Sequence, residues 1–425
     1  MGRISFATAS LLATTATASG IARPAIFRRQ NNPPTEAEVT FNDITPSPEL
    51  KWVDCYTPEE NLQCAYLTVP LDYADSSAGT INVAYMRYLL SEDAPDMMFN
   101  PGGPGIGGID YVKSGGAKYS KQWGYNYVSF DPRGVGFTGP KISCSPSDSS
   151  NSTLARRDSI LGDLKSKWDE AVVKHNDCND YNKNTDAKYV GTLANVQDIM
   201  HFTELQATLR GQDSEEAMVN FYGVSYGTLM GQTLVATYPD RLRRVLLDGN
   251  VYGVAHYQGW EPTGLDDFAH GIWMFNKFCF EAGPEWCTLA EGMNSIDEVK
   301  ARFDAVVSKL YLEPVQVGET KFDGDAFLGL VQQCMYDPRA PGKGYKEIAN
   351  ATLAIEMGDT EKLAAPSQKA KREAPVTSGD ELHIITAADI ANRYPWHAYE
   401  DWKAATERLA LTAPYGAFGY ATLNG

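Results

Sequence analysis

Three kinds of sequence feature are scarce in this chain, and each absence argues against a class of protein. The apolar run from Ile4 to Ala13 is too short to cross a bilayer and no later segment is long enough, so we expect no membrane span. Lys and Arg number 37 against 54 Asp and Glu, and the net charge of −17 argues against nucleic acid or an anionic membrane surface as a partner. No C-x-x-C pair or histidine cluster accompanies the seven cysteines, so we expect no zinc site.

The first residues read as a secretory signal. Arg3 supplies the positively charged n-region, the short apolar run follows it, and Ala16-Thr17-Ala18 fits an A-x-A cleavage site. Residues 1–18 are therefore predicted to be a signal peptide, and 19–48 a pro-segment or tether, rich in Pro and polar residues toward its end. This predicts a secreted, extracellular protein.

The cysteine count also fits an oxidising compartment. Close spacing suggests Cys55–Cys64 and Cys279–Cys287 as disulfides, and Cys144–Cys178 as a third, which leaves Cys334 unpaired. Asn151-Ser-Thr and Asn350-Ala-Thr are glycosylation acceptors if the chain is secreted.

Buried strands and amphipathic helices alternate through the first part of the chain. Two alternating runs, 65–69 and 81–90, predict antiparallel strands. After them we expect buried strands at 96–100, 125–130, 218–222 and 242–247, with a helix at 192–209. Strands separated by helices predict an α/β fold with a mostly parallel sheet and crossover helices.

The strongest chemical motif is Gly223-Val-Ser-Tyr-Gly227, which lies between a predicted strand and a helical pattern. In that context G-x-S-x-G is typical of a nucleophile elbow, a turn so tight that a Cβ at either glycine would collide with neighbouring backbone. Ser225 is the predicted nucleophile. The N–H of Tyr226, at the start of the helix, is a predicted oxyanion donor.

A glycine-rich stretch from Pro101 to Gly108 follows the strand at 96–100. It could be a flexible loop or a phosphate-binding loop, although it lacks both G-K-[ST] and G-x-G-x-x-G at a helix start. We favour an oxyanion loop in which the backbone at Gly102 and Gly103 approaches the reacting carbonyl, and we expect no cofactor. Asp131 and Arg133, after the next strand, are predicted to pin a loop by hydrogen bonds.

Helical patterns replace the alternation after Gln258. One apolar face includes Phe268 and Cys279, Ser295 to Glu298 is a capping box, and a third helix is expected around Phe327. Residues 364–379 predict an exposed loop, and a helix is expected from Asp389 to Leu411.

Together, three motifs resemble one family. Asn100-Pro-Gly-Gly-Pro-Gly105, Phe130-Asp-Pro-Arg-Gly-Val-Gly136 and the Ser225 motif, followed by Leu247-Asp-Gly249, resemble the secreted tripeptidyl-aminopeptidase and prolyl-iminopeptidase-like serine hydrolases. The resemblance implies an α/β-hydrolase fold with a core at 49–257, a helical lid at 258–380 and a returning core segment at 381–425. It also implies a Ser, Asp, His triad.

The family carries its acid in an Asp-Pro-x-Thr-Pro-like loop and its base in a late Gly-His loop, and neither motif is found here. The last core strands are expected to be missing, and Ala387 stands where a cysteine partner for Cys334 is expected. Among six histidines, His256 is the best substitute base; His201 and His270 are expected on helices, and His175 in a polar loop. Asp248 is a substitute acid or a loop anchor.

The resulting hypothesis is a secreted serine hydrolase that cleaves peptide N-termini, or a small amide or ester, through an acyl-enzyme at Ser225. Two alternatives stay open. The chain could be a truncated family member with weak or no turnover, or it could hydrolyse a small metabolite, since this scaffold hosts many acyl-transfer reactions.

Overall fold

The structure is a computed structural model that describes residues 39–56, 61–144, 164–259, 267–317, 320–340, 344–359, 363, 379–391, 393 and 396–415. The predicted signal peptide, the first part of the predicted tether, the Asn151 acceptor and all but the last residue of the loop predicted at 364–379 lie outside these residues. None of the described helices is both long and apolar enough to cross a membrane.

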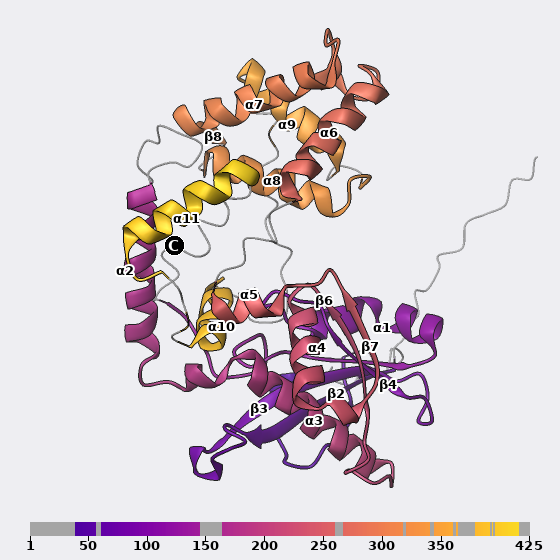
Figure 1. Cartoon of the computed structure of the whole chain (residues 1–425). Coiled ribbons are helices and arrows are strands. Elements are labelled where there is room, and N and C mark those ends of the chain that lie inside the picture. Colours follow the sequence, from indigo (N-terminus) through magenta and orange to yellow (C-terminus); the bar gives the residue numbers. More distant parts are fainter. Residues whose placement is uncertain are drawn as a thin grey trace, which may run out of the picture. The chain divides into compact units, whose positions relative to one another are not determined.

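A seven-stranded sheet forms the first part of the described chain (Figure 1). Its strand order is β1-β2-β3-β5-β4-β6-β7; the first three pairings are antiparallel and the last three are parallel. The strands are β1 Val53–Asp54, β2 Leu62–Pro70, β3 Thr80–Tyr88, β4 Asp96–Asn100, β5 Asn126–Phe130, β6 Val219–Val224 and β7 Leu242–Asp248. The predicted α/β fold, with its antiparallel lead-in strands and parallel remainder, is confirmed.

Helices cover both faces of this sheet because side chains alternate along each strand. In β3, Val83 and Tyr85 belong to a buried cluster that includes side chains of α3 Thr192–Leu209 and α4 Tyr226–Thr237. The intervening Ala84 and Met86 belong to a second cluster, with side chains of α1 Ile109–Trp123. The short helix α5 Gly253–Gln258 follows β7.

A separate hydrophobic cluster joins the helices that follow α5. These helices are α6 Phe268–Ala282, α7 Ile296–Leu312, α8 Gly324–Tyr336 and α9 Tyr345–Met357. An antiparallel pair, β8 Val315–Val317 and β9 Thr320–Phe322, lies between α7 and α8. The predicted cap is present: the Ser295 side chain accepts a hydrogen bond from Glu298 N, whereas the Glu298 carboxylate reaches Asn294 N.

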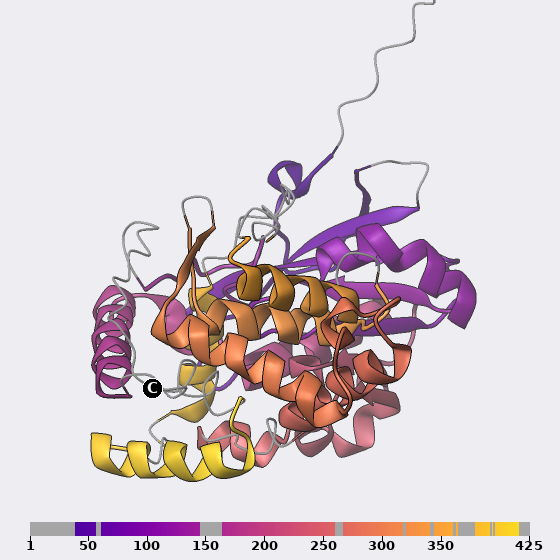
Figure 2. The ribbon, with the colours of Figure 1, turned by 90° about the horizontal axis from the view of Figure 1, so that it is seen from above.

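Two secondary-structure predictions are wrong. The helix expected from Asp389 to Leu411 is two helices, α10 Asp380–Ile390 and α11 Tyr399–Thr412. Ala391 follows α10 as its C-cap with φ 43°, in the left-handed region, so the helix ends there. His175, expected in a loop, lies in α2 Leu164–Asn182, a helix whose surface is mostly polar. Figures 1 and 2 show α2 beside α11, where the Trp168 and Trp402 rings lie 5.5 Å apart.

Short 3-10 helices complete the described elements: η1 Phe41–Asp43, η3 Ser76–Ala78, η4 Asp186–Tyr189, η5 Pro239–Arg241 and η7 Thr288–Ala290. The structure forms the three disulfides expected from spacing, Cys55–Cys64, Cys144–Cys178 and Cys279–Cys287, and leaves Cys334 as a buried free thiol. Asn350 is exposed, but it lies within α9 rather than in a loop.

Candidate active site

Ser225 occupies the turn between β6 and α4, where it is the N-cap residue of α4. Its backbone has φ 55° and ψ −123°, a conformation that side chains with a Cβ rarely adopt, and the residue is exposed. A Cβ at Gly223 would lie 2.2 Å from Gly227 O, and one at Gly227 would lie 2.5 Å from Asn100 O. Both motif glycines are therefore required by close backbone contacts, as the sequence predicted.

The glycine-rich loop after β4 approaches this turn directly. A Cβ at Gly102 would lie 2.7 Å from Val224 O and 2.9 Å from the Ser225 Cβ. Gly102 N donates to Asn100 Oδ1 over 3.0 Å, so this N–H is already used within the loop. Gly103 N has no acceptor among the described residues, and Tyr226 N lies in the first turn of α4, where no intrahelical acceptor exists.

Asp131 holds the far end of the same loop. Its carboxylate accepts hydrogen bonds from Ile109 N (3.3 Å) and Phe137 N (3.0 Å). A Cβ at Gly107 would lie 2.4 Å from Asp131 Oδ1, so the backbone passes very close to the carboxyl group. Burial raises the pKa of Asp131 to about 7, and the backbone donors oppose that rise.

Arg133 does not pair with Asp131. Instead it forms a bidentate ion pair with Asp198 of α3, with Nε–Oδ2 and Nη2–Oδ1 distances both of 2.7 Å. Both side chains are fully buried, and Arg133 also donates to the carbonyl oxygens of Pro70 and Leu71. The two residues predicted to pin a loop therefore both do so, through different partners.

His256 and Asp389 form a buried pair close to the elbow. His256 Nε2 lies 3.1 Å from Asp389 Oδ2, and the two residues are 7% and 5% exposed. The Asp389 carboxylate also accepts hydrogen bonds from Thr192 N and Thr192 Oγ1, both over 2.6 Å. Asp389 thus places negative charge at the N-terminus of α3, where the unsatisfied N–H groups favour it.

The same network reaches the residue after the nucleophile. Thr192 Oγ1 lies 2.6 Å from the Tyr226 hydroxyl, and the Tyr226 and His256 rings are 6.1 Å apart. Burial and the nearby Asp389 carboxylate raise the pKa of Tyr226, so its hydroxyl stays protonated. α10, α5, α3 and α4 therefore meet at one polar cluster, which consists of His256, Asp389, Thr192 and Tyr226.

Asp248 has other partners. Its main-chain oxygen accepts a hydrogen bond from Ser225 N over 3.0 Å, and its carboxylate accepts one from the Tyr222 hydroxyl over 3.3 Å. It stands beside the elbow as predicted, but the carboxylate that contacts His256 belongs to Asp389. Sequence reasoning had no signal for Asp389, which lies 133 residues from its histidine partner.

Ser225 Oγ has no hydrogen-bond partner among the described residues, and therefore none from a histidine. His201 and His270 lie on α3 and α6, as expected. Burial lowers the pKa of His383, on α10, to about 4, so this side chain is neutral at physiological pH.

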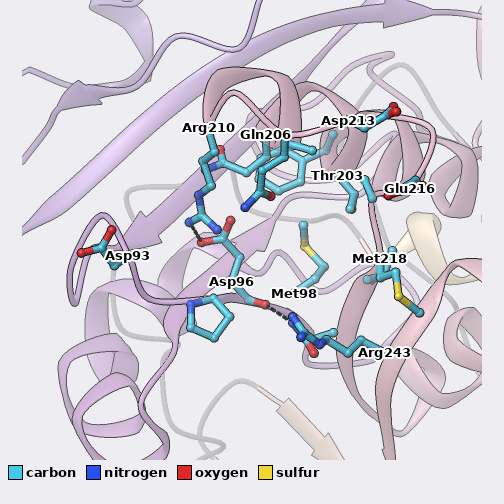
Figure 3. A pocket seen from close by; sticks show the side chains of 17 residues that line it. Asp93, Asp96, Met98, Thr203, Gln206, Arg210, Asp213, Glu216, Met218 and Arg243 are labelled. Atoms are coloured by element: carbon cyan, nitrogen blue, oxygen red, sulfur yellow. Dashed lines mark hydrogen bonds and ion pairs between the residues drawn. The ribbon is translucent and has the colours of Figure 1, made fainter.

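A cavity of about 600 Å³ lies at the opposite end of the parallel strands (Figure 3). Asp96, Asn220 and Arg243 line it from the first residues of β4, β6 and β7, whereas Ser225 follows the last residue of β6. The Asp96–Arg210 ion pair, at 2.8 Å, forms part of its wall. This cavity is separate from the elbow, so we do not assign it to acyl transfer.

Comparisons with known proteins agree with the observed fold. Residues 95–269 match the family described as the alpha/beta hydrolase fold. The chain has the α/β-hydrolase fold. Tripeptidyl aminopeptidase of Streptomyces coelicolor is 29% identical over 235 residues, which cover 51% of this chain and 40% of the relative. Serine protease Hip1 of Mycobacterium tuberculosis is 27% identical over 217 residues, which cover 48% and 39%.

This chain therefore spans about two fifths of the length of these curated relatives. Among solved structures, 2-hydroxy-6-oxo-6-phenylhexa-2,4-dienoate hydrolase from Rhodococcus superposes with a TM-score of 0.28 at 13% identity. That match covers 82% of this chain and 75% of the other.

Proposed function

We propose that this chain is a secreted serine hydrolase of the aminopeptidase type, which cleaves peptide N-termini, or a small amide or ester, through an acyl-enzyme at Ser225. The observation that carries the proposal is the strained Ser225 turn with the Gly102 backbone packed against it. The names of the relatives support a peptide substrate. The three disulfides support an extracellular location.

In the proposed reaction, Ser225 Oγ attacks the substrate carbonyl carbon and a base removes the hydroxyl proton. The developing oxyanion accepts hydrogen bonds from Tyr226 N and Gly103 N, which are fixed before the reaction begins. Gly102 has a different role, since its N–H is bound to Asn100 and its missing side chain lets the loop approach. The C–N or C–O bond then breaks as the leaving group takes the proton, and water hydrolyses the acyl-enzyme.

His256 is the proposed base and Asp389 its acid partner. The 3.1 Å contact with Asp389 Oδ2 fixes the imidazole and stabilises its protonated form after proton transfer. We expect slow turnover, because no hydrogen bond joins His256 to Ser225 in the described part of the chain and an unactivated serine is a poor nucleophile.

A substrate panel tests the proposal. We expect release of p-nitroaniline from a tripeptidyl anilide with a free amino terminus, less release from its N-acetylated form, and none by Ser225→Ala. Equal rates on both peptides with faster hydrolysis of a p-nitrophenyl ester would favour a small-ester hydrolase. Activity that survives Ser225→Ala would reject the proposal.

A further inference from the structure

The strained backbone of Ser225 is held by hydrogen bonds on both of its sides. A residue in such a conformation persists only where the surrounding structure fixes it. Ser225 N donates to Asp248 O over 3.0 Å, which ties the turn to the end of β7. Ser225 O accepts two hydrogen bonds, both from Thr228 of α4: one from its N–H over 2.8 Å and one from its hydroxyl over 2.6 Å. Thr228 therefore holds the carbonyl side of the nucleophile.

The Thr228 hydroxyl has a second partner. Its Oγ1 accepts a hydrogen bond from Val251 N over 2.9 Å. A backbone N–H can only donate and a carbonyl oxygen can only accept, so the hydroxyl proton must point to Ser225 O. The side chain is 0% exposed, which shields both bonds from solvent. One hydroxyl thus links the turn after β6 to the segment after β7.

Gln232, one helical turn further along α4, binds the same residue. Its Nε2 donates to Val251 O over 2.8 Å, so side chains of α4 hold both main-chain groups of Val251. Thr228 and Gln232 are four residues apart and therefore lie on one face of the helix. The Gln232 amide also lies against the first residue of α5, because a Cβ at Gly253 would lie 2.8 Å from Gln232 Oε1.

We propose that Thr228 and Gln232 are positioning residues that couple the Ser225 turn to α5, the helix that carries His256. The inference rests on the proposed function, in which His256 is the base. Val251 lies two residues before α5, so a shift of Val251 moves the helix and its imidazole relative to Ser225 Oγ. Proton transfer needs the base within about 3 Å of the hydroxyl, directly or through one water. A displacement of about 1 Å can therefore slow the reaction by about 100-fold.

A pair of substitutions at Thr228 tests the link. Thr228→Val removes the hydroxyl with little change in shape and leaves Val251 N without its acceptor, whereas Thr228→Ser keeps the hydroxyl. We expect Thr228→Val to slow labelling of Ser225 by a fluorophosphonate probe by about tenfold or more, and Thr228→Ser to restore most of the wild-type rate. Thr237→Val is the matched control and should label like the wild type. Its hydroxyl is exposed on the same helix and donates to Thr233 O.

A double-mutant cycle separates positioning from a general loss of structure. If Thr228 acts by placing the base, Thr228→Val should slow labelling much less in a His256→Ala background than in the wild type. Gln232→Met keeps the length of the side chain, removes its amide, and should show the same dependence on His256. Equal fold-changes in the two backgrounds would overturn the proposal.

Amide hydrogen exchange at Val251, measured by NMR, tests the contact without any reaction at Ser225. Exchange should be faster in Thr228→Val than in the wild type and unchanged in Thr228→Ser. If the wild type is labelled and Thr228→Val is labelled equally fast, the positioning role is wrong and the proposed function stands. A wild type that is not labelled at Ser225 would refute the proposed function and the positioning role with it, and the exchange rates would still show whether the hydroxyl binds Val251. Circular dichroism confirms that each variant is folded.

Discussion

Replacing Gly102 with alanine tests the contact between the glycine-rich loop and the elbow. Gly102 has φ +109°, and an added Cβ would lie 2.7 Å from Val224 O and 2.9 Å from Ser225 Cβ. Gly79 is a matched control, since its φ is +100° and an added Cβ there meets nothing within 4 Å. Gly79→Ala therefore reports the backbone strain alone, about 1–2 kcal/mol.

Gly102→Ala adds a steric cost of about 1–3 kcal/mol, since neither the Val224 carbonyl nor the Ser225 backbone can move without disturbing the turn. The loop should shift away, taking the Gly103 N–H out of line, and loss of one oxyanion donor slows acyl transfer by about 100-fold. Urea denaturation measures the stability difference, and the rate of Ser225 labelling by a fluorophosphonate probe measures the chemical effect. If Gly102→Ala and Gly79→Ala have the same stability and the same rate of Ser225 labelling, the loop does not contact the elbow as described.

Two further predictions concern buried carboxylates. Asp389→Asn should slow labelling of Ser225 by the fluorophosphonate probe more than Asp248→Asn does. The reason is that Asp389 contacts His256, whereas the Asp248 carboxylate contacts Tyr222. A larger effect at Asp248 would reverse the assignment of the acid. Burial raises the pKa of Asp131 to about 7, and the unfolded value is about 3.9. The folded state then holds this proton more tightly than the unfolded state does. The resulting contribution to the free energy of unfolding is complete below about pH 4, and about 4 kcal/mol of it is lost as the pH rises to 7. Urea denaturation across this pH range should show that loss for the wild type and not for Asp131→Asn; equal slopes would contradict it.

The elbow and its loop could be predicted from the sequence because local backbone geometry selects their residues. Gly223, Gly227 and Gly102 each stand where a Cβ would collide with backbone or with Ser225 itself. These close contacts allow only glycine, so they are visible in the sequence as glycines on both sides of the nucleophile and in the loop after β4. The strands could be predicted as well, since a sheet that is covered on both faces needs short, continuously apolar runs.

The acid partner could not be predicted in the same way. Asp389 contacts Thr192 and His256, which precede it in the sequence by 197 and 133 positions. No local pattern distinguishes such a carboxylate from one that faces solvent. Arg133 is a similar case, because its partner Asp198 lies on the following helix rather than in the same loop. The helix α2 was missed because its few apolar residues do not form a clear stripe.

Mapping the site of fluorophosphonate labelling tests the central claim most directly. The purified chain is treated with the probe, digested, and the modified peptide identified by mass spectrometry, with Ser225→Ala and heat-unfolded chain as controls. The account predicts a single modified serine, Ser225, in the folded wild type and none in either control. Absence of labelling at Ser225, or equal labelling of the unfolded chain, would show that the elbow does not activate its hydroxyl.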